Sequence, residues 1–164
     1  MTNVSEFLAA NERYAAEFHD GDLPMPPGRK VAVLTCMDAR IDPAKILGLK
    51  VGDAHVVRNA GGRASGDALR SLIISEQLLG TEEIVVIHHT DCGMLTFSND
   101  QLREQLTQQF KSDAREIDFL PFTDLTESVQ DDIATIRASP FIPAGIPITG
   151  FLYDVGSGRL SPVE

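Results

Sequence analysis

Two cysteines and one histidine are the residues whose types and spacing best suit chemistry in this sequence. Cys36 ends one apolar segment, and His89 ends another and is followed three positions later by Cys92. Thiolate and imidazole suit Zn²⁺, and a Cys₂His set with an open fourth position for water is a pattern of catalytic zinc sites. The residues alone leave a second explanation open, because a cysteine at the end of an apolar strand is more often a small core residue.

Asp38 and Arg40 follow Cys36 closely and form a second candidate pair. They could be a surface ion pair, which contributes little to stability. Alternatively, Arg40 holds Asp38 ionised and aimed at a metal-bound water. An unpaired aspartate at this place could instead occupy the fourth zinc position and prevent catalysis.

A glycine-rich turn, residues 58–62, follows a second predicted strand. Because glycine lacks a Cβ, the backbone of Ala60, Gly61 and Gly62 can approach a small substrate closely. We therefore take these three residues as candidate substrate-binding positions.

His88 competes with His89 as a metal ligand. Adjacent strand residues face opposite sides, so only one of them can share a pocket with Cys92. We expect His88 to be structural, packed under a helix with a backbone partner. His55, inside a predicted strand, and His19, near the predicted first helix, are expected to be bystanders.

The elements that must position these side chains alternate between strands and helices. Strands are predicted at 31–36, 54–59 and 84–89, with a helix at 65–80 between the last two. The first strand is apolar on both faces, as in a parallel sheet that is covered by helices. Ligands of open α/β sheets bind beyond the carboxyl ends of the strands, which is where Cys36 and His89 lie.

Further helices are predicted at 3–18, 99–110 and 124–138, and residues 148–161 are predicted to form a strand, a turn and a return strand. The expected fold is α/β: a mostly parallel central sheet flanked by helices, an antiparallel C-terminal edge hairpin and an N-terminal helical arm. We expect a single domain, 1–164, in which residues 1–28 form the helical arm and a proline-rich connector. The arm is expected to pack on a partner subunit.

Composition limits the possible partners. The formal net charge is −10, and no basic stripe offers a surface for nucleic acid or anionic membrane. The N-terminus lacks the features of a secretory signal, and no apolar run is long enough to span a bilayer, so we expect a cytoplasmic protein. Two thiols in that setting are not expected to be a disulfide framework.

Three ordered segments resemble the signature segments of β-class carbonic anhydrases. They are Cys36-x-Asp38-x-Arg40, Arg58-Asn59-Ala60-Gly61 and His89-x-x-Cys92-Gly93. The resemblance implies one zinc ion per chain, held by the residues matching Cys36, His89 and Cys92, and an Asp38–Arg40 dyad that orients the zinc-bound hydroxide. It also implies reversible hydration of CO2 to bicarbonate by a homodimer or homotetramer that exchanges N-terminal helices.

Three positions depart from the family pattern. The family usually has serine where Ala39 stands, plant-type members have glutamine near Lys50, and many members have a small residue at Met94. With the short chain, these departures resemble a compact branch that also includes carbonyl sulfide hydrolases. Hydrolysis of carbonyl sulfide to CO2 and hydrogen sulfide at the same zinc site is therefore the alternative activity.

Two further hypotheses belong to other classes. A binding module could keep the zinc site and lack turnover, in which case a fourth protein ligand is expected. A redox dithiol would join Cys36 and Cys92 in a disulfide, but it explains neither His89 nor the Asp38–Arg40 pair.

Overall fold

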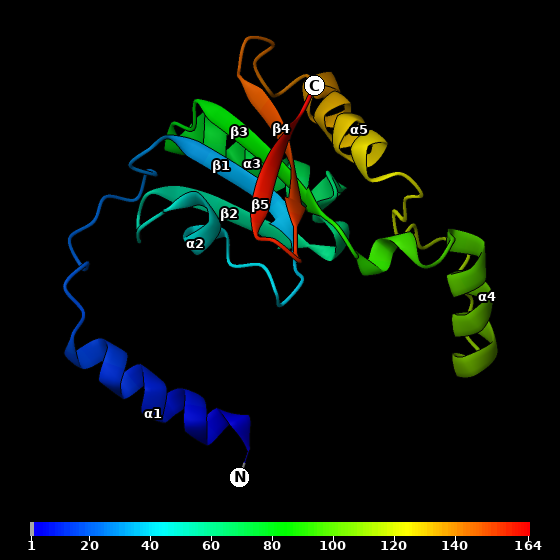
Figure 1. Ribbon diagram of the computed structural model, residues 1–164, viewed down its shortest axis with the longest axis horizontal. Coiled ribbons are helices and arrows are strands. Elements are labelled where there is room, and N and C mark those ends of the chain that lie inside the picture. The colour runs from blue at the N-terminus through cyan, green and yellow to red at the C-terminus, as the bar shows by residue number, and fades with distance from the viewer. Residues whose placement is uncertain (1) are drawn as a thin grey trace.

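The computed structural model describes residues 2–164 as a twisted sheet with some helices packed on it and others projecting away from it (Figure 1). The sheet has five strands in the order β2-β1-β3-β4-β5; the first four are parallel, and β5 pairs antiparallel with β4 at the edge. The strands are β1 (Val31–Cys36), β2 (Ala54–Asn59), β3 (Glu83–His89), β4 (Ile148–Asp154) and β5 (Arg159–Val163). This arrangement confirms the predicted fold class.

The helices are α1 (Asn3–Ala16), α2 (Pro43–Leu47), α3 (Gly66–Leu79), α4 (Asn99–Phe110) and α5 (Leu125–Ala138). Two single 3₁₀ turns, η1 (Ala60–Gly62) and η2 (Gly93–Leu95), follow β2 and β3. The short helix α2 was not predicted. Its five residues are too few to show a helical period, although Asp42 caps it and proline opens it.

The main core lies between one face of the sheet and helices α3 and α5. Leu34 and Val86 of the sheet pack there with Leu72 of α3 and with Val129 and Ile136 of α5, and all five side chains are buried. The opposite face carries a smaller apolar cluster around three buried residues, Val33, Val85 and Ile87. Burial on both faces explains why β1 and β3 are continuous apolar runs.

Gly150 in β4 allows α5 to lie close to the sheet. A Cβ at this position would come within 2.5 Å of Val129 and 2.9 Å of Ile133, both on α5. Only glycine leaves room for this approach. As a result, polar residues of α5 can reach the end of β3, which carries His88 and His89.

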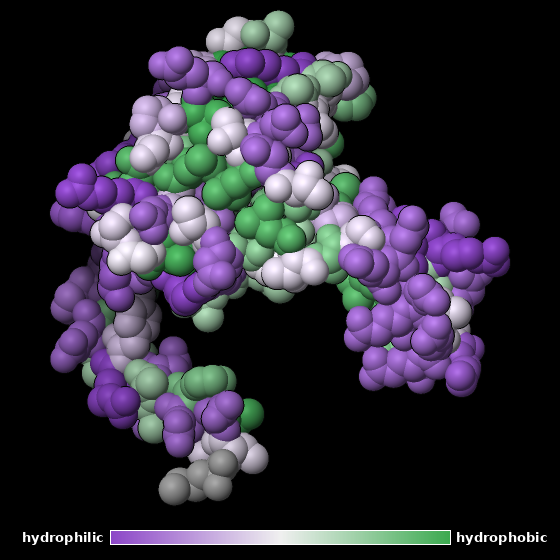
Figure 2. Space-filling view, turned by 45° about the vertical axis from the view of Figure 1, so that its right-hand side comes forward, coloured by the Kyte–Doolittle hydropathy of each residue, from purple (hydrophilic) through white to green (hydrophobic). Residues whose placement is uncertain are grey.

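Helix α1 lies away from the sheet at the end of an extended connector (Figure 1). None of its residues is buried, and its hydrophobic side chains gather on the surface of the arm at the lower left of Figure 2. The exposed set is Val4, Phe7, Leu8 and Tyr14. Within residues 2–164, the structure contains no helix with the length and apolar character that a membrane crossing requires.

Candidate metal centre

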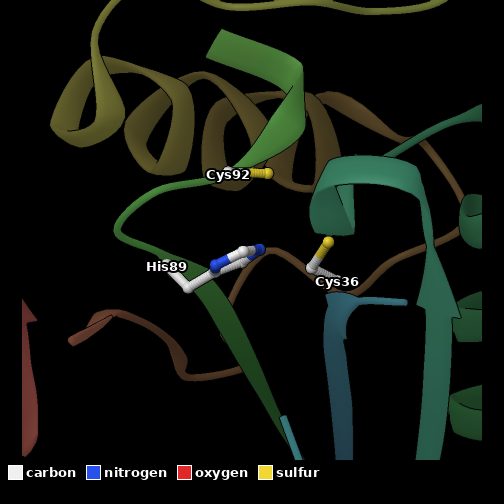
Figure 3. A group of neighbouring side chains, drawn as sticks. All are labelled: Cys36, His89 and Cys92. Carbon is white, nitrogen blue, oxygen red and sulfur yellow. The ribbon is translucent and has the colours of Figure 1, made fainter. Parts of the chain in front are cut away.

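Three side chains converge where β1 and β3 end. Cys36 is the last residue of β1, His89 is the last residue of β3, and Cys92 precedes η2. Because β1 and β3 are adjacent and parallel, their carboxyl ends meet at one edge of the sheet. The ligand atoms of the three residues lie within 4.8 Å of one another and point into a shared space (Figure 3). The structure thus brings together the three predicted ligands.

The ring of His89 is oriented for metal binding. Its Nδ1 lies 2.9 Å from the carbonyl oxygen of Thr90, so Nδ1–H donates to that oxygen and Nε2 keeps its lone pair. Nε2 is buried and has no hydrogen-bond partner among residues 2–164. A buried polar atom without a partner is costly, and a metal ion between Nε2 and the two sulfurs would satisfy it. Two thiolates and one imidazole fit Zn²⁺ in particular.

The thiols of Cys36 and Cys92 lie close enough to affect each other's pKa. The pKa of Cys36 is lowered, chiefly by its interaction with Cys92, although burial acts in the opposite direction. The pKa of Cys92 is raised, chiefly by its interaction with Cys36 and by burial. The two thiols therefore do not both ionise readily by themselves, and a bound cation would favour the thiolate form of both.

Arg40 connects the two loops that carry the candidate ligands. It binds the Asp38 carboxylate with two N–H groups, Nε to Oδ1 at 3.0 Å and Nη2 to Oδ2 at 2.7 Å. It also donates to the side chain of Asp91 at 2.6 Å and to its carbonyl at 2.9 Å. These bonds to Arg40 hold the pKa of Asp38 far below its usual range, so the carboxylate is ionised. Its Oδ2 lies 3.8 Å from Nε2 of His89, close to the space between the ligands.

Asp91 was not predicted as part of the site. It lies between His89 and Cys92 with a φ of +55°, a left-handed conformation that is uncommon for residues other than glycine. Its two contacts with Arg40 stabilise this conformation. Its place inside the His89–Cys92 segment was the only signal in the sequence.

The glycine turn η1 packs directly on the end of β1. Gly61 and Gly62 have φ values of +80° and +73°, and a Cβ on Gly62 would lie 2.9 Å from the backbone nitrogen of Cys36. A Cβ on Gly61 would lie 2.9 Å from the side chain of Met94, which packs with Cys36 and Cys92. Gly61 and Gly62 therefore lie beside the candidate centre, and the contact of Ala60, Gly61 and Gly62 with substrate stays a prediction.

The remaining residues singled out in the sequence lie in different places. Met94 is buried in an apolar cluster with Cys36, Cys92 and Phe122, so it forms part of the wall of the centre. Lys50 and Ala39 are exposed, and His55 binds the hydroxyl of Ser75 away from the centre.

His88 lies on the opposite face of β3 from His89. It is fully buried, and its Nε2 lies 3.3 Å from the carbonyl oxygen of Gly62. It therefore has the structural place and the backbone partner that were predicted for it.

The fold and this centre define the chain as an α/β protein with a Cys₂His site at the carboxyl ends of parallel strands. The sequence model of the carbonic anhydrase family matches residues 31–160. The chain belongs to this family.

Individual relatives agree with this assignment over nearly the full length of the chain. Beta-carbonic anhydrase 1 of Mycobacterium tuberculosis is 43% identical and covers 99% of both chains. The carbon disulfide hydrolase of Saccharolobus solfataricus is 34% identical over 96% of this chain and 87% of its own. The solved carbonic anhydrase of Streptococcus mutans superposes with a TM-score of 0.95 at 51% identity, covering 100% of this chain and 99% of that one.

Proposed function

We propose that this protein hydrates CO2 reversibly to bicarbonate with one zinc ion held by Cys36, His89 and Cys92. The observation that carries the proposal is the convergence of two buried thiols on the partnerless Nε2 of His89. A bound zinc ion acidifies water, which makes a hydroxide nucleophile available near neutral pH. The chain's own residues must then orient this nucleophile and hold the substrate.

Asp38 and Arg40 are suited to orient the nucleophile. The carboxylate of Asp38 is ionised and can accept a hydrogen bond but cannot donate one. It therefore directs the proton of a hydroxide toward itself and leaves an oxygen lone pair free to attack carbon. Arg40 holds both carboxylate oxygens and so prevents Asp38 from turning toward the metal.

The wall of the centre is suited to a small, uncharged substrate. Met94 and Phe122 present apolar surface beside the two cysteines, and the backbone of the glycine turn approaches from the side of Cys36. Apolar walls exclude bulk water and leave the backbone N–H groups as the donors for a developing negative charge. Ala60, Gly61 and Gly62 are the proposed substrate contacts.

Carbonyl sulfide is the alternative substrate, with hydrolysis to CO2 and hydrogen sulfide. The relationship to a carbon disulfide hydrolase supports this alternative, because carbon disulfide also replaces oxygen of CO2 by sulfur. The carbonic anhydrase relatives are more similar to this chain, which favours CO2.

The deciding experiment compares substrates on the zinc-loaded protein. Stopped-flow measurement follows CO2 hydration, and sulfide release follows the turnover of carbonyl sulfide and carbon disulfide. Hydration of CO2 that exceeds the other rates by orders of magnitude supports the proposal, whereas rapid sulfide release with slow hydration supports the alternative. A zinc-loaded protein that turns over none of the three contradicts both and favours a binding module.

We also propose that the chain forms a homodimer or homotetramer through the arm that carries α1. The exposed aromatic and aliphatic side chains of α1 are too many for a free surface helix, since a helix with one apolar face normally buries it. The cytoplasmic location expected from the sequence stays a prediction.

A further inference from the structure

A second buried polar cluster lies behind the metal centre, on the other face of β3. It consists of Arg63, His88, Ser128 and Asp132, which come from three elements: the segment after η1, strand β3 and helix α5. His88 and Asp132 have exposed fractions of 0% and 3%. Buried charge of this kind is costly unless it is paired.

Asp132 holds the segment that follows the glycine turn with both of its oxygens. Oδ1 accepts the backbone N–H of Ala64 at 3.0 Å. Oδ2 lies 3.2 Å from Nε of Arg63 and 3.0 Å from Nε2 of His88. Neither contact of Oδ2 has the alignment of a hydrogen bond, since Oδ2 and Nε of Arg63 are both without a hydrogen-bond partner among the described residues. Both are therefore electrostatic contacts between buried groups.

His88 holds the turn itself. Its Nε2 faces two acceptors, Oδ2 of Asp132 and the carbonyl oxygen of Gly62 at 3.3 Å, so this nitrogen must carry the hydrogen. Its Nδ1 lies 2.7 Å from the hydroxyl of Ser128, which fixes the ring from the opposite side. The ring also stacks on Phe122, with the ring centres 5.5 Å apart and the planes at 16°.

The glycine turn that His88 holds also contacts Cys36, one of the three candidate metal ligands. The Cα of Gly62 packs on the backbone of Cys36 so closely that a Cβ there would lie 2.9 Å from the backbone nitrogen of Cys36. A shift of the turn therefore moves the residue that carries a candidate metal ligand. The surroundings of metal ligands control ligand orientation and metal affinity.

We propose that Asp132 is a positioning residue for the metal centre. Through Ala64 and His88 it fixes the glycine turn, so that Gly62 packs against the backbone of Cys36 and holds this residue in place. The inference rests on the proposed function only in taking this sulfur as a zinc ligand. It assigns the cluster a role in metal binding beyond its role in packing.

The test compares Asp132→Asn with Asp131→Asn. Asp131 is the exposed neighbour on the same helix, so the control makes the same chemical change without touching the cluster. The asparagine at 132 can offer one acceptor but not two, so either Ala64 or the Arg63–His88 side loses its partner. Zinc affinity is measured by competition with a chelator, and the cobalt-substituted protein is examined for its thiolate-to-cobalt absorption band.

We expect Asp132→Asn to weaken zinc binding by about tenfold, the range seen for groups that support metal ligands, and to shift the cobalt band. The control should match the wild-type protein in both measurements. Unchanged affinity and an unchanged band in Asp132→Asn overturn the proposal, even if the melting temperature falls, because a purely structural role predicts that result.

Ser128→Ala keeps the inference testable if Asp132→Asn does not fold. This change keeps Asp132 in place and removes the hydrogen bond to Nδ1 of His88, together with the bond that the hydroxyl donates to the carbonyl oxygen of Leu125 within α5. A smaller weakening of zinc binding with the same shift of the cobalt band supports the proposal, and wild-type values overturn it. Neither measurement depends on turnover, so failure of the CO2 assay and failure of this inference are distinguishable.

Discussion

Replacing Gly62 with alanine should disturb the metal centre from the backbone side. The φ of +73° costs an L residue about 1–2 kcal/mol. The added Cβ would lie 2.9 Å from the nitrogen of Cys36 and from the carbonyl carbon of Thr35, both backbone atoms that cannot rotate away. Forced overpacking costs about 1–3 kcal/mol. The free energy of unfolding should therefore fall by about 2–5 kcal/mol, the sum of the two effects.

Two other glycines separate these contributions. Gly80 has a φ of +72°, but an added Cβ there would meet nothing within 4 Å, so Gly80→Ala should cost only the backbone contribution of about 1–2 kcal/mol. Gly66 also has open space and lies at the start of α3 without a positive φ, so Gly66→Ala should be neutral or stabilise by up to about 1 kcal/mol.

Thermal unfolding and chelator competition on the three variants measure both effects. At this chain length, 1 kcal/mol corresponds to roughly 2–4 °C, so Gly62→Ala should melt about 4–20 °C below the wild-type protein. Among the three variants, it alone should also bind zinc more weakly, because it alone displaces Cys36. The reasoning is refuted if Gly62→Ala melts and binds zinc as Gly80→Ala does.

Three further outcomes are expected. Cys36→Ala should abolish zinc binding by metal analysis and reduce CO2 hydration to background, and a fully active, metal-free variant would contradict the proposed function. Ser98→Ala removes the N-cap of α4, whose hydroxyl accepts the N–H of Gln101, and should lower stability by about 1 kcal/mol in thermal unfolding. The double change Phe7→Glu with Leu8→Glu should lower the molar mass measured by light scattering if α1 joins subunits, and an unchanged mass would exclude that role.

The sheet could be predicted because its signals are local. The strands at 31–36 and 54–59 match the structure residue for residue, since each has β-branched residues at its centre and turn residues beyond its ends. The helix predicted at 65–80 has the predicted ends: the hydroxyl of Ser65 accepts the N–H of Ala68, and Gly80 ends α3 in a left-handed conformation. Predicted helix 3–18 is two residues shorter, with its last residue at Ala16.

The metal centre could be predicted in part for the same reason. Cys36 and His89 end strands whose pattern predicts a parallel sheet, and topology then brings them together. The buried polar cluster around Asp132 could not be predicted, because the hydrogen bond between Ala64 and Asp132 joins residues that are 68 positions apart in the sequence. One signal was available: Ser128 and Asp132 are four residues apart and share the apolar face of α5 with Val129 and Ile133, where polar side chains need partners.

The two adjacent histidines at the end of β3 also bear on how the strand finds its alignment. Residues 84–87 are apolar and buried on both faces, so a slip by one residue against β1 exchanges these faces while both stay apolar. After such a slip each face would still receive an imidazole, displaced by about 3.3 Å along the strand. Burial of these four residues alone therefore selects the register only weakly. The hydrogen bond of His88 with Ser128 favours the observed register, so a contact that holds the finished site also distinguishes correctly folded molecules from misaligned ones.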